Sequence, residues 1–198
     1  MKKKIIAVIS LCAFSLTATP FGLRAETIAA DKNEPARAIR VAPPAPKFTD
    51  AERQAELARR RAEVAKQMKP NSVLILWSAE PRNYAGDVDF YYRQENNLYY
   101  LTNLKQTNAT LVITKNGDGG VQEYLFLPKR NPQFETWNGR MYSREDATRI
   151  SGLKNIMDST ETASFLQSIK EKKAFGSKEG ASFGGSGVET LYLLTPFN

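Results

Sequence analysis

Histidine is absent from this 198-residue chain, and cysteine occurs once, at Cys12. Catalytic triads of the Ser-His-Asp or Cys-His kind need a histidine, so neither can be assembled here. A single cysteine also excludes an intrachain disulfide, and a zinc site would need carboxylates alone. We therefore expect no catalytic residue and no metal-ligand set in this chain.

The first 25 residues have the layout of a secretory signal peptide. Three lysines, Lys2 to Lys4, precede an apolar run from Ile5 to Leu16, and small residues follow near Ala18 and Ala25. The apolar run is shorter than the roughly 20 residues of a membrane-spanning helix. We expect cleavage after one of these alanines and export to the periplasm or the extracellular space, with no membrane span.

The chain has little excess charge once this segment is removed. The formal net charge is +7, and four of the positive charges lie within residues 1–25, which carry no acid, so the remainder carries +3. A nucleic-acid surface needs a basic stripe on one face. The cluster Arg59 to Arg61 lies among glutamates in a helical stretch, which indicates a solvated helix face. We therefore expect no nucleic-acid partner.

Proline divides the chain. Residues 26–48 are polar and then proline-rich, a composition typical of an extended linker. The chain as a whole is 41% hydrophobic and 25% charged, which is the balance of a soluble globular protein. Residues 49–198 are therefore expected to form one domain.

The first half of this domain contains one helix and two apolar runs. Thr49 and Glu52 form a capping-box pattern, which predicts a helix to about Met68. The continuous apolar run Val73–Trp77 predicts a strand covered on both faces. A second run, Leu98–Leu101, predicts another strand beside the first.

The second half adds a hairpin, two helices and a strand. "KNGDGG" separates Thr110–Thr114 from Glu123–Leu127 and supplies the positive φ angles of an antiparallel hairpin. Capping residues and apolar spacing predict helices over residues 143–152 and 161–173, and a strand follows within residues 189–195. The expected fold class is α/β, with a mixed β-sheet flanked by helices.

Three short motifs have ordinary structural interpretations. "FGGSG" at Phe183–Gly187 lacks the ending of a phosphate loop and indicates a flexible turn. Asn108 begins a glycosylation sequon of a kind common by chance. Asp87 and Asp89 have no third metal ligand of the right type nearby, which favours a solvated loop.

Two longer blocks are more specific. One is "RNYAGDVDFYYRQENNLYYLTNL", and the other is "LFLPKRNPQFETWNGRMYSREDATRISGL". Together with their spacing they resemble the amino-terminal domain of Xaa-Pro aminopeptidase (aminopeptidase P, in the creatinase-prolidase family), over about residues 49–160. Asn103 stands where that family usually has glycine. Both residues tolerate a left-handed backbone, so we expect the turn to be kept.

This resemblance implies a division of labour. The family's activity is the manganese-dependent release of an amino-terminal residue that precedes proline. Its metal pair is held by two Asp, one His and two Glu in a carboxy-terminal "pita-bread" domain, which we expect to be missing from this chain. The implied partners are that catalytic domain, in cis or in trans, proline-containing peptides through the parent enzyme, and other copies in a homo-oligomer.

The same resemblance suggests four residues near a substrate cleft or subunit interface: Arg93, Tyr99, Trp137 and Arg140. Core packing is an equal alternative for Tyr99. For Arg93 a structural ion pair is favoured over a clamp on a peptide carboxylate. Alternation along a strand predicts that Tyr100 is more buried than Tyr99.

Three functions stay open on the sequence alone. The chain is the non-catalytic part of an exported Xaa-Pro metalloaminopeptidase, a stand-alone module that binds peptides or docks on a partner, or a remnant without activity.

Overall fold

The structure, a computed structural model, describes residues 47–194. The signal peptide predicted for residues 1–25 and nearly all of the linker predicted for residues 26–48 lie outside the described residues. Of the helices in residues 47–194, none is both long and apolar enough to cross a membrane.

Residues 47–194 form five α-helices and nine strands. The helices are α1 Asp50–Gln67, α2 Asn96–Thr102, α3 Pro132–Asn138, α4 Arg144–Ser151 and α5 Thr162–Glu171. The strands are β1 Ser72–Trp77, β2 Asn83–Ala85, β3 Val88–Asp89, β4 Thr110–Lys115, β5 Val121–Leu127, β6 Asn155–Asp158, β7 Ala174–Gly176, β8 Ser182–Gly184 and β9 Thr190–Leu193. Short 3₁₀ turns occupy Ser159–Glu161 and Gly185–Gly187.

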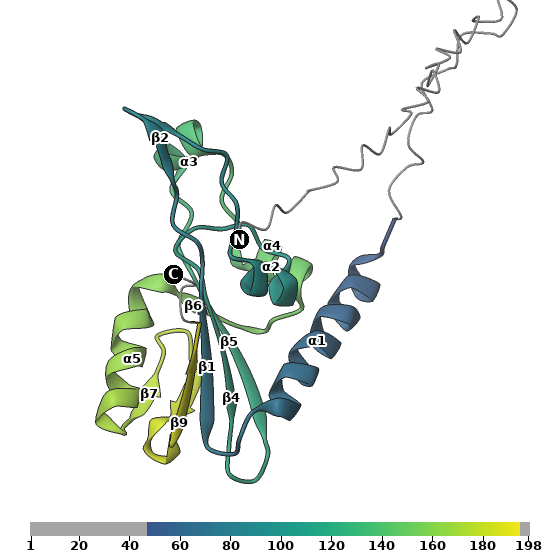
Figure 1. Cartoon of the computed structure of the whole chain (residues 1–198), viewed down its shortest axis with the longest axis vertical. Helices are drawn as coiled ribbons and strands as arrows, with labels where there is room; N and C mark the ends of the chain where they lie inside the picture. The colour runs from purple at the N-terminus through teal and green to yellow at the C-terminus, as the bar shows by residue number, and fades with distance from the viewer. Residues whose placement is uncertain (1–46, 195–198) are drawn as a thin grey trace, which may run out of the picture. The chain divides into compact units, whose positions relative to one another are not determined.

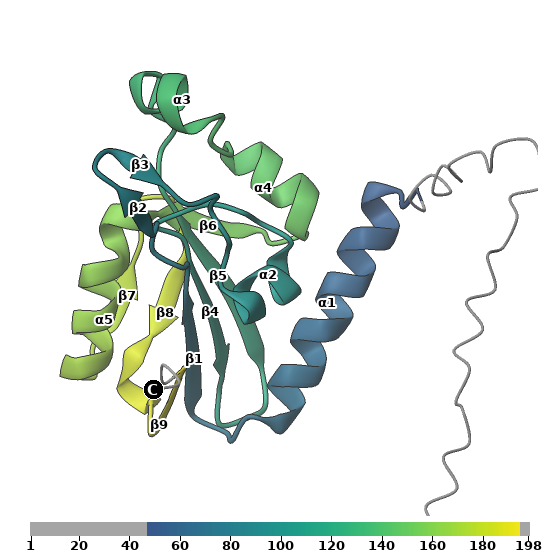
Figure 2. The same ribbon diagram turned by 45° about the horizontal axis from the view of Figure 1, so that its top comes forward.

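A five-stranded mixed sheet forms the centre, in the order β6-β5-β4-β1-β9. β4 pairs antiparallel with both β1 and β5, whereas β1 pairs parallel with β9 and β5 parallel with β6. The predicted hairpin is therefore confirmed as β4 and β5, and the predicted fold class is confirmed. α1, α2 and α4 cover one face of the sheet, and α5 with β7 covers the other (Figures 1 and 2).

Each face of the sheet has its own hydrophobic core. On one face Leu76 belongs to a buried cluster with Ala65 of α1 and Leu98 of α2. On the other face Ile75 belongs to a cluster with Phe165 of α5. Because successive strand side chains point to opposite faces, the continuous apolar run of β1 serves both cores.

α1 begins as the sequence predicts but buries one residue that was expected in solvent. The capping box is present, since the Thr49 side chain accepts from the Glu52 N–H and the Glu52 carboxylate accepts from the Thr49 N–H. Arg61, however, is only 1% exposed and is one of the buried residues of α1. The solvated-face interpretation holds for Arg59 and is wrong for Arg61.

The predicted strand at Leu98–Leu101 is wrong, because these residues lie in α2. The Glu95 carboxylate accepts from the Leu98 N–H at 2.7 Å and caps the helix start. Asn103 ends the helix with a left-handed φ of 57°, so the expected left-handed turn at this position is confirmed. Leu98 and Leu101, three positions apart, face the core as helix spacing requires.

The two tyrosines of α2 therefore both face outward. Tyr99 is 38% exposed and Tyr100 is 53% exposed, so the prediction that Tyr100 is the more buried of the two is wrong. The core-packing alternative for Tyr99 is wrong as well.

The remaining predicted elements are confirmed as α4, α5 and β9, whereas β2, β3, α3, β6, β7 and β8 were not predicted. The "FGGSG" stretch ends β8 and continues as a 3₁₀ turn at Gly185–Gly187, so the predicted turn is present over its second half. Phe183 is buried in β8, and a Cβ on Gly185 would lie 2.2 Å from the carbonyl oxygen of Lys173. This glycine permits a close backbone approach.

Candidate interaction surface

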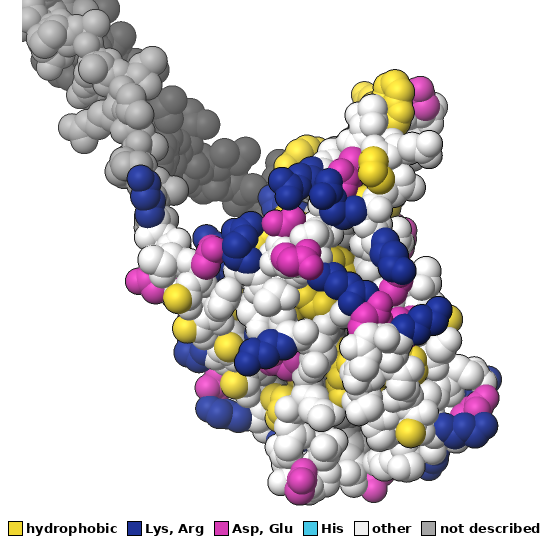
Figure 3. All heavy atoms as spheres, turned by 180° about the vertical axis from the view of Figure 1, so that it is seen from behind, with side chains coloured by type: hydrophobic (Ala, Val, Ile, Leu, Met, Phe, Trp, Pro, Cys, Tyr) yellow, Lys and Arg dark blue, Asp and Glu magenta, His cyan; other side chains and the backbone are white. Residues whose placement is uncertain are grey.

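One end of the domain carries most of the exposed aromatic side chains. There the β2–β3 hairpin lies beside α3 (Figures 1 and 2), and hydrophobic side chains gather at this projecting end (Figure 3). We call it the aromatic end. Its large exposed hydrophobic residues are Tyr84, Val88, Phe90, Tyr91, Phe134 and Trp137. Tyr91 and Trp137 are each 88% exposed. Clustered exposed apolar side chains of this size mark interaction surfaces in soluble proteins.

The β2–β3 hairpin holds its aromatic side chains in fixed positions. Asn83 pairs with Asp89 across the hairpin, and Gly86 adopts a φ of 58° in the turn, a value that favours glycine. The Tyr84 and Phe90 rings meet edge to face with centroids 5.0 Å apart. This contact between the two rings therefore stabilises the β2–β3 hairpin while leaving both rings exposed.

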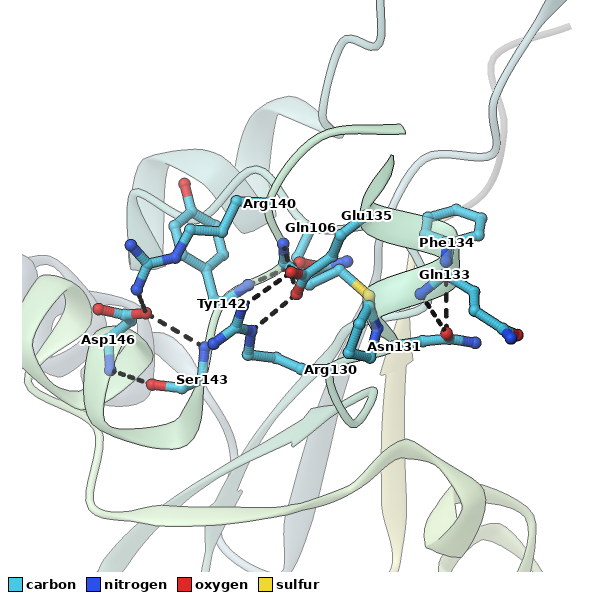
Figure 4. A network of polar contacts seen from close by, with 12 residues as sticks. Gln106, Arg130, Asn131, Gln133, Phe134, Glu135, Arg140, Tyr142, Ser143 and Asp146 are labelled. Atoms are coloured by element: carbon cyan, nitrogen blue, oxygen red, sulfur yellow. Dashed lines mark hydrogen bonds and ion pairs between the residues drawn. The ribbon is translucent and has the colours of Figure 1, made fainter. Parts of the chain in front are cut away.

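α3 stands on a bidentate ion pair. The Asn131 side chain caps the helix by accepting from the N–H groups of the next turn. Arg130 Nε and Nη2 donate to the two oxygens of Glu135, each at 2.7 Å, and Glu135 Oε1 also accepts from the Met141 N–H at 3.2 Å (Figure 4). The hydrogen bonds from Arg130 lower the pKa of the Glu135 carboxyl. The Glu135 carboxylate thus binds a residue before α3, Arg130, and a residue after it, Met141.

A second ion pair fixes the residues that follow α3. Arg140 Nη2 lies 3.1 Å from Asp146 Oδ2, and the same oxygen accepts from the Ser143 N–H at 3.3 Å (Figure 4). This backbone hydrogen bond, with help from Arg140, lowers the pKa of Asp146. Trp137 therefore projects from a segment that is anchored on either side.

A cavity of about 190 Å³ lies where the hairpin meets α3. Phe90 of the hairpin arm, Phe134 of α3, Arg140 and Lys105 all line it. The two parts of the aromatic end thus enclose a small space with both aromatic and cationic walls.

Gln94 connects this region to the rest of the domain, and sequence reasoning missed it. It is 5% exposed, and its Oε1 accepts from the N–H groups of Ala79 and Glu95 at 2.9 and 2.8 Å. Its Nε2 donates to the Gln106 carbonyl at 2.9 Å, and Gln106 Oε1 in turn accepts from the Tyr142 N–H. A single buried glutamine leaves no periodic pattern in a sequence. The only signal that could have pointed to Gln94 is its position inside the stretch "RNYAGDVDFYYRQENNLYYLTNL".

The four residues expected near a cleft or interface fall into two places. Trp137 and Arg140 lie together at and after α3. Tyr99 lies on α2, where the Lys105 ammonium is 5.6 Å from its ring centroid. Since Lys105 also lines the cavity beside Arg140, it connects Tyr99 with the aromatic end.

Arg93 lies just before α2 and is exposed. Its Nη2 is 3.4 Å from Asn96 Oδ1, a neutral partner. Among residues 47–194 no carboxylate forms an ion pair with Arg93, so the favoured structural ion pair is not formed there. The guanidinium stays accessible to an anionic group.

The acidic residues of the described range do not gather around a common point. No three side chains of His, Cys, Asp or Glu in residues 47–194 come close enough to hold a metal ion. Asp89 accepts a long hydrogen bond of 3.4 Å from the Asn83 amide within the hairpin. The arrangement offers a binding surface, with aromatic rings and guanidinium groups as its recognition elements.

A family model described as "Aminopeptidase P, N-terminal domain" matches residues 57–175 of this chain. The chain belongs to this family. The matched range runs from α1 to β7 and includes the aromatic end, Gln94 and all four residues expected near a cleft.

Curated relatives agree with this assignment. The Xaa-Pro aminopeptidase of Haemophilus influenzae is 33% identical over 114 residues, which cover 58% of this chain and 26% of the relative. Intermediate cleaving peptidase 55 of Schizosaccharomyces pombe is 32% identical over 118 residues, covering 59% and 24% respectively. The chain thus spans about a quarter of the length of these relatives.

A solved structure shows the same fold in an enzyme. The zinc-substituted aminopeptidase P of Escherichia coli in complex with product superimposes with a TM-score of 0.54 at 27% identity, covering 57% of this chain and 26% of that enzyme. The match accounts for the mixed sheet and its flanking helices.

Proposed function

We propose that this chain is the non-catalytic amino-terminal domain of an exported Xaa-Pro metalloaminopeptidase, where it shapes the substrate cleft and contributes oligomer contacts. The family match supports the kind of domain, and the relatives named Xaa-Pro aminopeptidase support the parent activity. That activity is the release of an amino-terminal residue that precedes proline.

The aromatic end is the observation that carries the proposal. Trp137 is 88% exposed within a cluster of exposed apolar side chains, a feature that marks interaction sites, and its segment is held by two ion pairs. Interfaces concentrate their binding energy in Trp, Tyr and Arg, the residue types found here. The catalytic domain, in cis or in trans, is the partner that we assign to this end.

The catalytic chemistry belongs to that partner. The divalent metal pair, which we take to be manganese, needs a ligand set that this chain does not fit, since it has no histidine and its described acids do not converge. We therefore derive no catalytic step within this chain. Its contribution is to position the substrate and to exclude water.

Individual side chains suit this positioning role. The accessible guanidinium of Arg93 suits a peptide carboxylate, and Arg140 suits a carbonyl or carboxylate at the cleft rim. Tyr99 and Trp137 offer flat apolar surfaces for a proline ring. Export follows from the signal peptide predicted for residues 1–25, which would place the enzyme in the periplasm or outside the cell.

The proposal is tested by comparing the full chain alone with a fusion. The full chain is joined in frame to the part of the Haemophilus influenzae Xaa-Pro aminopeptidase that it does not match. We expect no release of amino-terminal residues from Xaa-Pro peptides by the chain alone with added Mn²⁺, and measurable release by the fusion. Manganese-dependent release by the chain alone would overturn the non-catalytic role.

A point substitution tests the surface itself. Trp137→Ala in the fusion is expected to lower kcat/KM by about tenfold or more, the usual effect of losing an interface tryptophan. Val121→Ala, which changes an exposed apolar residue of β5, serves as the control and should leave kcat/KM unchanged. If Trp137→Ala and Val121→Ala both keep the kcat/KM of the unaltered fusion, the aromatic end does not contact the catalytic domain through Trp137.

A further inference from the structure

A second surface lies between α1 and α2, away from α3. It is a groove of about 800 Å³. We call it the α1–α2 groove, and its lining includes Phe48, Arg60, Asn96, Tyr99, Tyr100 and Asn103. Neither the aromatic end nor a metal site accounts for it.

Three aromatic rings give the groove its apolar walls. Phe48 is 64% exposed, and Tyr99 and Tyr100 are both exposed along α2. The Arg60 guanidinium lies 4.3 Å from the Tyr100 ring centroid, and Arg60 Nη1 donates to the Tyr100 carbonyl at 3.0 Å. The Tyr100 ring is therefore held in place before any ligand arrives, which lowers the entropy lost on binding.

The charged side chains along the groove already have partners. Glu56 Oε1 lies 2.9 Å from Arg60 Nε, and Arg53 Nη1 lies 2.7 Å from Asp50 Oδ1. Glu52 serves the capping box of α1. What the groove presents to a ligand is thus aromatic faces with the side-chain amides of α2 and its cap, which suits a largely neutral segment rather than a charged one.

Aromatic walls with amide donors are the chemistry that recognises a polyproline II segment. Such a segment packs proline rings on aromatic faces, and its carbonyls have no internal hydrogen bonds, so they accept from side-chain donors. The groove follows α1 from Phe48 to Arg60, about 18 Å at the rise of an α-helix. A polyproline II segment of seven residues spans about 19 Å, a matching length.

The chain contains one segment of this chemistry and length. Residues 40–46 read RVAPPAP, with three prolines in four positions and a single charge at Arg40. This segment lies outside the described residues and ends two positions before Phe48, which lines the groove. When two copies meet at their α1–α2 grooves, the point at which each segment joins the described residues, at Phe48, lies within the contact. Such a contact is made twice by symmetry, so two weak interactions reinforce each other.

We infer that the α1–α2 groove binds residues 40–46 of a second copy of this chain. The dimer joins two copies by reciprocal exchange of their proline-rich segments. It uses neither the aromatic end nor a catalytic domain. It rests on the proposed function only in giving the oligomer contacts a specific form, and its tests measure dimerisation rather than peptidase activity.

Two complementary variants of the full chain test the exchange. The first carries Pro43→Gly, Pro44→Gly and Pro46→Gly and keeps the groove; the second carries Phe48→Ala and Tyr100→Ala and keeps the segment. By analytical ultracentrifugation we expect the unaltered protein to dimerise, and each variant alone to dimerise at least about tenfold more weakly. An equimolar mixture of the variants should form a one-to-one complex that is weaker than the unaltered dimer and tighter than the dimer of either variant, because it keeps one of the two groove–segment contacts.

The outcomes separate clearly. A monomeric unaltered protein, variants that dimerise as well as the unaltered protein, or a mixture that associates no more tightly than either variant alone would each overturn the inference. Tyr91→Ala, which removes an exposed tyrosine outside the groove, is the control and should dimerise normally. Thermal melting confirms that each variant is folded.

A peptide gives a second measurement that needs no substitution in the protein. A synthetic peptide with the sequence of residues 38–47 should dissociate the dimer of the unaltered protein. The same peptide with its three prolines replaced by alanine should not. Equal effects of the two peptides would exclude recognition of a polyproline II segment.

Discussion

Arg61 Nε lies 2.9 Å from Glu123 Oε1, and this ion pair joins the middle of α1 to β5. The N–H does not point along the contact, so the pair is held by charge rather than by an aligned hydrogen bond. Arg61 Nη1 donates instead to the carbonyls of Leu101 and Ser151, at 3.0 and 3.1 Å. One buried guanidinium therefore connects α1 with the sheet and with the ends of α2 and α4.

Replacing Arg61 should destabilise the domain. Arg61→Ala is expected to lower the free energy of unfolding by about 3 kcal/mol, the lower end of the range for breaking a buried pair, because Glu123 stays partly hydrated. Arg59→Ala removes an exposed arginine two positions before Arg61. It should change the free energy of unfolding by no more than about 0.5 kcal/mol. Urea unfolding measures both, and equal losses would contradict the burial of Arg61.

α2 gives a sharp contrast between inward and outward residues. Leu98→Ala should cost about 2–5 kcal/mol of unfolding free energy, because Leu98 is fully buried. Tyr99→Ala and Tyr100→Ala should each cost less than about 1 kcal/mol, since both rings are exposed. A large loss for Tyr100→Ala in chemical denaturation would favour the strand that the sequence predicted.

Gln94 is expected to be irreplaceable by an apolar residue of the same length. Gln94→Met leaves the buried Gln106 carbonyl without this donor, at about 1–3 kcal/mol. It also removes the acceptor of the partly buried amides of Ala79 and Glu95, whose hydrogen exchange should become faster. Gln133→Met, at an exposed position of α3, is the matched control. Unchanged exchange at both amides in the Gln94 variant would show that its hydrogen bonds do not hold the loop.

Asp158 should make stability depend on acid pH. A hydrogen bond from the Thr160 N–H, with further help from Lys129, lowers the pKa of Asp158 from 3.8 to about 2. Because the folded-state pKa lies below the unfolded one, the stabilisation is complete above about pH 4 and is lost as the pH falls through about 2. The melting temperature of the unaltered protein should therefore exceed that of Asp158→Asn at pH 7, and the gap should close near pH 2. The same gap at both pH values would rule out the linkage.

Local chemistry was sufficient for much of the framework. The capping box at Thr49, the Asn-Gly and Asp-Gly pairs between β4 and β5, and the continuous apolar run of β1 all act within a few residues, so the elements they define could be predicted. Leu98–Leu101 shows where such reasoning fails. A four-residue apolar run fits a strand and a helix equally well, and the cap at Glu95 was decisive only once α2 could pack on α1 and α4.

The sequence by itself determined the fold class, the family resemblance over the two aromatic blocks, the helix α1 and the β4–β5 hairpin, because each depends on residues close together in the chain. Only the tertiary structure decided that Arg61 is buried, that Gln94 joins the α2 loop to the residues after α3, and that the β2–β3 hairpin lies beside α3. The physical reason is sequence separation. Arg61 meets its carbonyl partners 40 and 90 residues away, and no local period encodes contacts across such distances.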